Sequence, residues 1–152
     1  MNGYFSSYTL PNIGRVWVAK TSKGICRIEI NKDKNQFLKC LPAHISWQEG
    51  RPQNHRSIPK APLDFSSGTP FQQKVWRQII KIPKGETRSY AWLAKMAGRP
   101  KAVRAAANAC GANPIPVLIP CHRVIRSDGT IGGFSGPLSL KKHLLKLEGI
   151  RF

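Results

Sequence analysis

The sequence predicts a mixed α/β (α+β) fold. A small antiparallel β lobe is expected over residues 1–65, and a helical lobe with a winged-helix-like helix-turn-helix over 66–152. Short segments with β-branched and aromatic residues, separated by turn formers, fill residues 3–30. From Thr69 on, apolar residues recur at helical spacing behind capping residues. The polar, proline-rich stretch between these two patterns is typical of a linker.

The N-terminal lobe is predicted to hold a small sheet. Its candidate strands are the segments GYFSSYTL, GRVWVAK and GICRIEI, separated by Pro11 to Gly14 and by the turn sequence TSKG. The following segment, KDKNQFLKCLPAH, predicts a short helix that ends near Pro42. Three strands and one short helix are therefore expected before the linker.

Four helices are predicted in the C-terminal lobe. The first has the clearest start, because Thr69 can cap it, Pro70 suits its first turn and Gln72 completes a capping box. A serine or proline precedes each of the other three, and a glycine follows each. These three helices are expected over 90–97, 101–110 and 138–148.

The second and third of these helices, separated by Gly-Arg-Pro, have the layout of a helix-turn-helix. Positions 105, 106, 107 and 109 are alanine, so the third helix has little side-chain bulk, and Arg104 is its long exception. A stripe of small residues is also typical of close helix packing. The basic charge of the chain favours contact with DNA, where such a helix brings its backbone close to its partner.

Charge is the strongest compositional signal. The chain has 25 Lys and Arg against 7 Asp and Glu, a formal net charge of +18, and the part from Phe71 on carries 15 basic and 3 acidic residues. A polyanionic partner is the natural explanation, and a generally basic proteome is the alternative. No run has the length of a membrane span, and the N-terminus lacks a secretory layout. We expect a soluble protein without membrane contact, cytoplasmic in a prokaryote or nuclear in a eukaryote.

Cysteine spacing excludes the common zinc knuckles. Cys26, Cys40, Cys110 and Cys121 form no C-x-x-C pair. A disulfide between Cys26 and Cys40, or a metal site formed by these two with His44 and His55, stays open. Reduced thiols are favoured because intracellular cysteines are usually reduced.

The segment NPIPVLIPCHRVI carries the candidate chemistry. Its aliphatic run predicts a buried strand that ends at Pro120, after which a thiol, an imidazole and a guanidinium follow in sequence. A cysteine becomes a nucleophile as the thiolate, which a nearby imidazole favours. Glu148 ends the last helix, where the macrodipole disfavours a carboxylate by about 0.3–1 kcal/mol unless a cation faces it. A Cys121, His122 and Glu148 triad and an inert buried cysteine beside a core histidine are both compatible with these residues.

The motifs together resemble one family. The likeness rests on IPCHRVI with NPIPV before it, on GGFSG and LLKLEG after it, and on GETRSYAWLAKMAG and RAAANA upstream. In these motifs the chain is similar to the O6-alkylguanine-DNA alkyltransferases, the methylated-DNA–protein-cysteine methyltransferases. The motifs run in family order from about Phe71 to Gly149, whereas the N-terminal lobe matches only in its strand-rich character. The resemblance implies direct-reversal DNA repair by a monomer that needs no cofactor and no metal. The base of O6-alkylguanine, or of O4-alkylthymine, would be flipped out through the minor groove of double-stranded DNA, and its alkyl group would pass irreversibly to the protein in a single turnover.

By position, the resemblance assigns five catalytic roles. Cys121 matches the alkyl acceptor, His122 its water-mediated base and Glu148 the carboxylate that polarises this histidine. Asn113 matches the hinge between recognition helix and active site. Tyr90 matches the proton donor to guanine N3, and it is also expected to touch DNA.

Further positions match the substrate pocket and the DNA surface. Arg104 matches the arginine that fills the gap in the base stack. The pocket positions are Val124, Phe134 and Ser135, and the remaining DNA-contact positions are Gln72, Arg99 and Ser127. Phe134 stands where many members have tyrosine, Pro137 replaces a common glycine, and RAA replaces RAV. These departures concern the width of the pocket.

Three other classes share parts of this pattern. An alkyltransferase-like protein recognises lesions without repairing them, but such proteins replace the acceptor cysteine that this chain retains at Cys121. A transcriptional regulator would need base-reading side chains on its recognition helix, and alanines read few bases. A turnover thiol hydrolase would need an oxyanion hole and an acyl substrate, which the strong basic charge does not favour.

Overall fold

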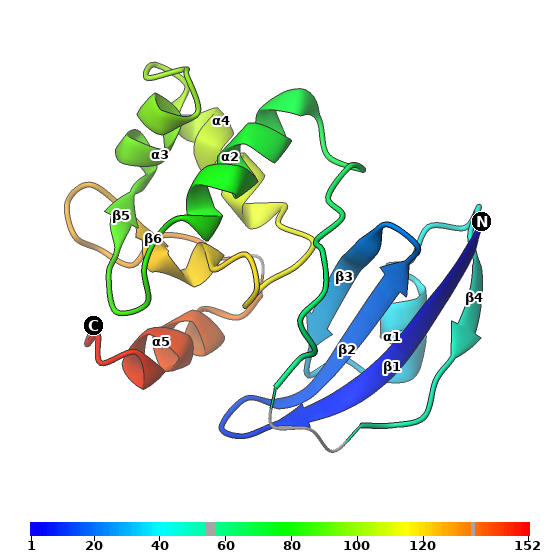
Figure 1. Cartoon of the computed structure of the whole chain (residues 1–152). Helices are drawn as coiled ribbons and strands as arrows, with labels where there is room; N and C mark the ends of the chain where they lie inside the picture. The colour runs from blue at the N-terminus through cyan, green and yellow to red at the C-terminus, as the bar shows by residue number, and fades with distance from the viewer. Residues whose placement is uncertain (54–56, 135) are drawn as a thin grey trace. The chain divides into compact units, whose positions relative to one another are not determined.

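The computed structural model describes residues 1–53, 57–134 and 136–152. The chain forms two compact units, Met1–Phe65 and Ser66–Phe152 (Figure 1). The mixed α+β class predicted from the sequence is confirmed, with strands dominating the first unit and helices the second. No helix within the described residues is long and apolar enough to cross a membrane.

The N-terminal unit is built on a four-stranded sheet of order β3-β2-β1-β4. The antiparallel pairings of β1 with β2 and of β2 with β3 follow the prediction. Strand β4 was not predicted: it is short and polar, and it pairs in parallel with β1 at the sheet edge. The strands are β1 (Asn2–Leu10), β2 (Gly14–Thr21), β3 (Gly24–Ile30) and β4 (Ser46–Glu49).

Helix α1 (Lys34–Leu38) closes one face of this sheet through a single buried side chain. The ring of Phe37 stacks on Trp17, with centroids 5.5 Å apart, and lies 5.7 Å from the ring of Phe5. Aromatic rings at these distances contribute beyond the area that they bury. The core of the unit is thus aromatic, and a helix of five residues suffices to complete it.

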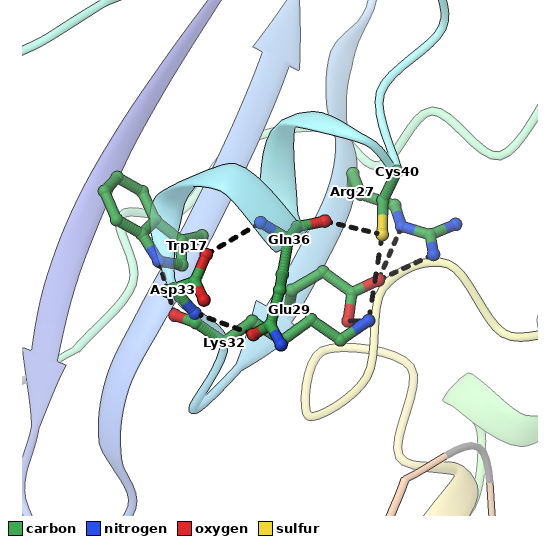
Figure 2. Close-up of polar contacts among 7 residues, drawn as sticks. All are labelled: Trp17, Arg27, Glu29, Lys32, Asp33, Gln36 and Cys40. Atoms are coloured by element: carbon green, nitrogen blue, oxygen red, sulfur yellow. Dashed lines mark hydrogen bonds and ion pairs between the residues drawn. The ribbon is translucent and has the colours of Figure 1, made fainter.

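A polar network surrounds helix α1 (Figure 2). The carboxylate of Glu29 accepts hydrogen bonds from Arg27 and pairs with Lys32 at 2.7 Å. The ammonium of Lys32 also lies 3.7 Å from Sγ of Cys40. Cys40 and Cys26 are free thiols, so these two described cysteines do not form the disulfide left open by the sequence. His55 lies outside the described residues, among which no group of three potential metal ligands occurs.

The described residues of the C-terminal unit form four α-helices, one turn of 3-10 helix and a short parallel strand pair. Helices α2, α3 and α4 pack against one another, and α5 packs against the 3-10 turn η1. The elements are α2 (Pro70–Ile80), β5 (Arg88–Ser89), α3 (Tyr90–Met96), α4 (Val103–Gly111), η1 (Cys121–Arg123), β6 (Val124–Ile125) and α5 (Leu138–Leu147).

The predicted N-terminal caps of α2 and α3 are confirmed. Thr69 and Gln72 form the reciprocal capping box at the start of α2, and the hydroxyl of Ser89 accepts the N–H of Trp92 at 3.0 Å. Trp76 then anchors α4, since its indole N–H donates to the carbonyl of Ala109 at 2.8 Å. Local capping therefore starts the helices, and buried contacts between them fix their packing.

Two predictions for this unit are wrong in detail. Helix α4 begins at Val103, later than the expected start after Pro100, because the residues before it form turns and Ala102 has no polar side chain to cap it. Residues 114–119, all of them described, form a turn in place of the predicted strand. Pro114 and Pro116 lack the N–H groups that a buried strand would donate to its neighbours.

Candidate active site

The segment after Pro120 forms the single turn η1 between the 113–120 turn and strand β6. Cys121 and His122 begin this turn and are only 2% and 3% exposed. Both side chains are therefore out of bulk water, and their protonation depends on the groups that immediately surround them.

Asn113 holds the turn that leads from α4 into η1. Its Nδ2 donates to the carbonyl of Ile119 at 2.8 Å, and its Oδ1 accepts the N–H of Ile115 at 2.9 Å. Within this turn Val117 has a φ of 75°. A β-branched residue in that conformation costs on the order of 1–3 kcal/mol, and such strain persists where surrounding contacts fix it. The amide of Asn113 is one such contact, and it fixes the backbone that delivers Cys121.

Glu148 caps the C-terminus of α5, and its carboxylate is clamped by three donors. Arg123 donates through Nε and Nη2 at 2.9–3.1 Å, and the backbone N–H of Gly85 donates at 3.0 Å. Burial by itself would raise the pKa of Glu148. The hydrogen bonds from Arg123, Gly85 and His122 outweigh it and lower the pKa to about 2. Glu148 is thus a carboxylate at neutral pH, and a guanidinium faces it at the unfavourable helix end.

His122 is held in one tautomer by this carboxylate. Its Nε2 lies 2.8 Å from Oε1 of Glu148, and because the carboxylate only accepts, Nε2 carries the proton. Burial lowers the pKa of His122 despite the opposing effect of Glu148. The imidazole is therefore neutral near pH 7, and the cation that faces Glu148 at the helix end is Arg123. The other nitrogen, Nδ1, is buried and has no hydrogen-bond partner among the described residues.

Lys141 is fully buried, which is exceptional for a lysine. Its Nζ donates to the carbonyls of Val124 (2.6 Å) and Gly133 (2.8 Å) and lies 3.4 Å from the hydroxyl of Tyr90. Burial lowers the pKa of Lys141, while the neighbouring thiols Cys110 and Cys121 oppose that shift. A cation thus stands beside the candidate nucleophile and joins three segments of the unit.

Tyr90, the first residue of α3, points toward the glycine-rich loop. Its hydroxyl donates to the carbonyl of Gly133 at 3.1 Å. A Cβ at Gly132, which has a φ of +72°, would lie 2.8 Å from the Tyr90 ring, so this close approach requires glycine. Burial, and then the negative charge that Cys110 and Cys121 can carry, raise the pKa of Tyr90 to about 12.

A cavity of about 410 Å³ lies between α3, α4 and the loops after β6. Among the described residues, its wall includes Tyr90, Cys110, Arg126 and Phe134, while Cys121 lies beside Cys110 rather than in the wall. Phe134, which was expected in the substrate pocket, is part of the wall of this cavity. Ser135, expected at the same pocket, lies outside the described residues.

Cys110 and Cys121 share their environment. The thiol of Cys110 donates to the carbonyl of Cys121 at 3.8 Å, and each of the two thiols shifts the pKa of the other. The bond from Cys110, followed by one from Asn113 and by the charge of Lys141, lowers the pKa of Cys121 although burial opposes it. The same bond, together with burial, raises the pKa of Cys110 well above its usual value. Of the two, Cys121 is therefore the sulfur prepared to be a thiolate.

Apart from Tyr90, the residues expected to contact DNA lie outside this network. Arg104, Arg99 and Ser127 are exposed, and the guanidinium of Arg99 lies over the ring of Phe71 at 5.0 Å. The side chain of Gln72 is engaged in the capping box of α2. On α4, Ala106 and Ala109 are buried while Ala105 is exposed. Close helix packing and a bare outer surface thus both apply to this alanine-rich helix.

Sequence reasoning missed three residues of the site. Arg123 was noted only as a neighbour of His122, and Lys141 was not singled out within the last helix. A signal existed for Lys141, because it shares a helical face with the buried Leu144 and Leu145 at i+3 and i+4. Cys110 gave no signal, since its meeting with Cys121 depends on the turn between them.

The fold and site define a class: a protein with a buried, activated thiol in a unit whose helices α3 and α4 have helix-turn-helix order. The family model described as the DNA-binding domain of 6-O-methylguanine DNA methyltransferase matches residues 70–150. The chain belongs to this family.

The alignments with two relatives cover different shares of the relatives' lengths. The methylated-DNA–protein-cysteine methyltransferase of Methanosarcina acetivorans is 50% identical over 158 residues, covering 96% of this chain and 98% of that protein. The bifunctional transcriptional activator/DNA repair enzyme Ada of Escherichia coli is 41% identical over 152 residues, covering 90% of this chain. The chain spans only 43% of the length of that Ada protein.

Among solved structures, the crystal structure of Mycobacterium tuberculosis OGT in complex with DNA superposes with a TM-score of 0.75. It is 29% identical, and the match covers 95% of this chain and 92% of that one. The likeness extends over both units, including the strand-rich N-terminal one whose sequence carries no family motif.

Proposed function

We propose that the protein repairs alkylated DNA by moving the alkyl group of O6-alkylguanine, and of O4-alkylthymine, onto Cys121. The observation that carries this proposal is the set of groups that converge on one sulfur: Asn113, Cys110 and Lys141 favour its thiolate, inside a domain of a DNA methyltransferase family. The names of the relatives in Methanosarcina and Escherichia support the same activity.

The proton of Cys121 leaves through His122. With Nε2–H donated to Glu148, the accepting lone pair of the neutral imidazole is at Nδ1, a buried nitrogen that requires a partner. One bridging water between Nδ1 and Sγ would carry the proton from thiol to imidazole. Glu148 stabilises the resulting imidazolium, while Arg123 keeps Glu148 ionised throughout.

Transfer is then a substitution at a saturated carbon. The Cys121 thiolate forms a bond to the alkyl carbon as the bond from that carbon to O6 breaks, and the electron pair passes to the guanine. Tyr90 can protonate N3 of the leaving base, because its raised pKa keeps its hydroxyl protonated at neutral pH. The thioether product has no accessible leaving group, so each chain reacts once.

Duplex DNA is the proposed partner, and the C-terminal unit is its proposed binding site. The +18 net charge favours phosphate contacts without sequence preference, and the bare surface of α4 suits the minor groove. The exposed Arg104 would fill the stack when the base turns out, offsetting part of a cost of a few kcal/mol. The N-terminal unit supports this fold, and the protein acts as a monomer in the compartment that holds the chromosome.

The deciding experiment mixes the reduced protein with an equimolar duplex that contains one O6-methylguanine. Intact-mass measurement should find one added CH2 unit per chain, and peptide mapping should place it on Cys121. A Cys26→Ser protein is the matched control and should accept the group normally. Repeated turnover, or a label on Cys110, would overturn the proposal.

A second arm tests base extrusion. Arg104→Ala should slow transfer from duplex DNA much more than transfer from free O6-benzylguanine, because the free base does not have to leave a stack. Lys101→Ala, a second exposed cation beside α4, is the control for general loss of charge. If Arg104→Ala slows transfer from both substrates equally, Arg104 supports the folded structure and has no specific role in base extrusion.

A further inference from the structure

Two thiols meet at the candidate active site, and the proposed reaction consumes only one of them. Cys110 ends the buried face of α4 and Cys121 begins η1, so the turn between them returns the chain onto itself. The Cys110 thiol donates to the Cys121 carbonyl at 3.8 Å, so the side chain of one cysteine touches the backbone of the other. Both residues are buried, at 4% and 2% exposure.

Small molecules can reach this pair through the cavity. Cys110 is part of the wall of the 410 Å³ cavity, together with Tyr90, Asn108 and Arg126. Hydrogen peroxide is close to water in size, so a space that holds several waters admits it. Cys121 lies directly against the thiol that borders this space. Burial from bulk solvent therefore does not separate the pair from a small oxidant.

The two sulfurs differ in character. The positive charge of Lys141 and the hydrogen bonds from Cys110 and Asn113 lower the pKa of Cys121, whereas its bond to Cys121 raises the pKa of Cys110. One sulfur is thus suited to attack an electrophile, and the other keeps its proton until the first has reacted. This is the division of work found in a pair of attacking and resolving thiols.

We propose that Cys110 is a resolving thiol for Cys121, and that a hydroperoxide converts the pair into a disulfide that thiol reductants reverse. In the first step the Cys121 thiolate bonds to one peroxide oxygen, the O–O bond breaks, and sulfenic acid and water form. In the second step the Cys110 sulfur displaces the hydroxyl, so that the S–S bond forms, the S–O bond breaks and water leaves. Overall, two thiols and one hydrogen peroxide give one disulfide and two waters.

The local backbone leaves room for the small approach that bond formation needs. Gly111 follows Cys110, and a Cβ built at Gly111 would meet nothing within 4 Å, so the end of α4 is not packed tightly there. The disulfide would block alkyl transfer reversibly and keep Cys121 from oxidation to the irreversible sulfinic acid.

The inference rests on the proposed function only in taking Cys121 as the reactive sulfur, and it is tested separately by mass. Reduced full-length protein is treated with hydrogen peroxide, free thiols are blocked with N-ethylmaleimide, and the protein is digested with trypsin. Both cysteines fall in one tryptic peptide, residues 105–123, because no lysine or arginine separates Arg104 from Arg123. We expect this peptide to lose two hydrogens and both maleimide sites, and to regain both sites after dithiothreitol. Transfer activity should be lost and recovered in parallel.

Variants complete the test. Cys110→Ser should leave Cys121 to gain two or three oxygens, without recovery by dithiothreitol, whereas Cys26→Ser with Cys40→Ser should still form the disulfide. Oxygen additions on Cys121 of the unaltered chain while Cys110 stays free, or a disulfide to Cys26 or Cys40, would overturn the inference. The unaltered chain gives this answer even if Cys110→Ser does not fold. Failure of the reduced protein to accept a methyl group would instead count against the proposed function alone.

Discussion

Two carboxylates of this chain meet arginine in different surroundings. In the N-terminal unit, the Glu29 side chain is 13% exposed, but its partners Arg27 and Lys32 are 32% and 39% exposed (Figure 2). In the C-terminal unit, the Glu148 side chain is 8% exposed and Arg123 is 16% exposed.

The difference lies in how much water each pair keeps. Exposed ion pairs are screened and contribute about 0–1 kcal/mol, whereas a buried charge depends on its partner because the partner replaces its hydration. The pKa is lowered for both carboxyls, and for Glu148 it falls to about 2. A network of similar residue types is thus a surface feature in one unit and the support of a reactive site in the other.

Cys121 and Cys40 show the same contrast between a buried and a more exposed neighbouring lysine. Substituting these two cysteines should give the largest difference in the rate of alkyl transfer. Cys121→Ser should lower alkyl transfer by at least about a thousandfold, because a hydroxyl replaces the activated thiolate. Cys40→Ser, beside the exposed Lys32, should transfer at the normal rate. Single-turnover assays with O6-methylguanine duplex check both. Normal transfer by Cys121→Ser would show that Cys121 is not the acceptor.

Substitutions of the two arginine partners should lower the free energy of unfolding by different amounts. Arg123→Met leaves Glu148 buried without its main cation and should lower the free energy of unfolding by about 3–5 kcal/mol. Arg27→Met leaves Glu29 with Lys32 and should cost no more than about 1 kcal/mol. Urea unfolding of both variants measures the difference. Equal costs would contradict the role given to burial.

The pH dependence of stability should come mainly from Glu148. Its pKa is lowered from 4.5 to about 2, so its contribution is fully present above pH 4.5 and is lost as the pH falls toward 2. A shift of this size corresponds to about 3 kcal/mol. Glu148→Gln should therefore flatten the stability profile between pH 4.5 and 2, and Glu29→Gln should change it less. Thermal unfolding of both variants across this pH range tests the prediction. Identical stability profiles would show that the hydrogen bonds to Glu148 contribute no more to the pH dependence than those to Glu29.

Substitutions of the two lysines that lie near cysteines, Lys141 and Lys32, should give the smallest difference in transfer rate. Lys141→Met removes a cation beside Cys121, so the pKa of Cys121 should rise and the pH–rate profile should move to higher pH. One pH unit would slow transfer about tenfold at neutral pH. Lys32→Met, beside Cys40, should leave the profile in place. A uniform loss of rate for Lys141→Met at every pH would instead indicate a role only in holding Gly133 and Tyr90.

Sequence reasoning reached the local features of this molecule and missed those that depend on distant parts of the chain. The caps at Thr69 and Ser89 were predictable, because the groups involved lie within three residues of each other. Strand β4 and the turn 113–120 were not, since their conformations depend on pairing with β1 and on the amide bonds of Asn113. The features that depend on contacts within a few residues were predicted, and those that depend on contacts with distant parts of the chain were not.

The site shows the same division. The motif residues Cys121, His122 and Glu148 were named from the sequence, and His122 and Glu148 are hydrogen-bonded in the structure. Arg123 and Lys141 were missed because long cationic residues are usually exposed, and only the packing of α5 reveals that these two are not. Their roles in transfer remain predictions that the experiments above address.

Helix α5 carries Lys141 near its start and Glu148 at its end. Seven residues, or two turns, separate them, so about 10 Å of rigid helix joins the group that contacts Tyr90 to the group that holds His122. A sliding or tilting of this helix would move both ends together and would disturb at once the two steps that we propose for Tyr90 and His122, protonation of the leaving base and activation of the thiol. Variants selected to accept bulkier alkyl groups should therefore accumulate substitutions at residues 131–134, and spare the body of α5.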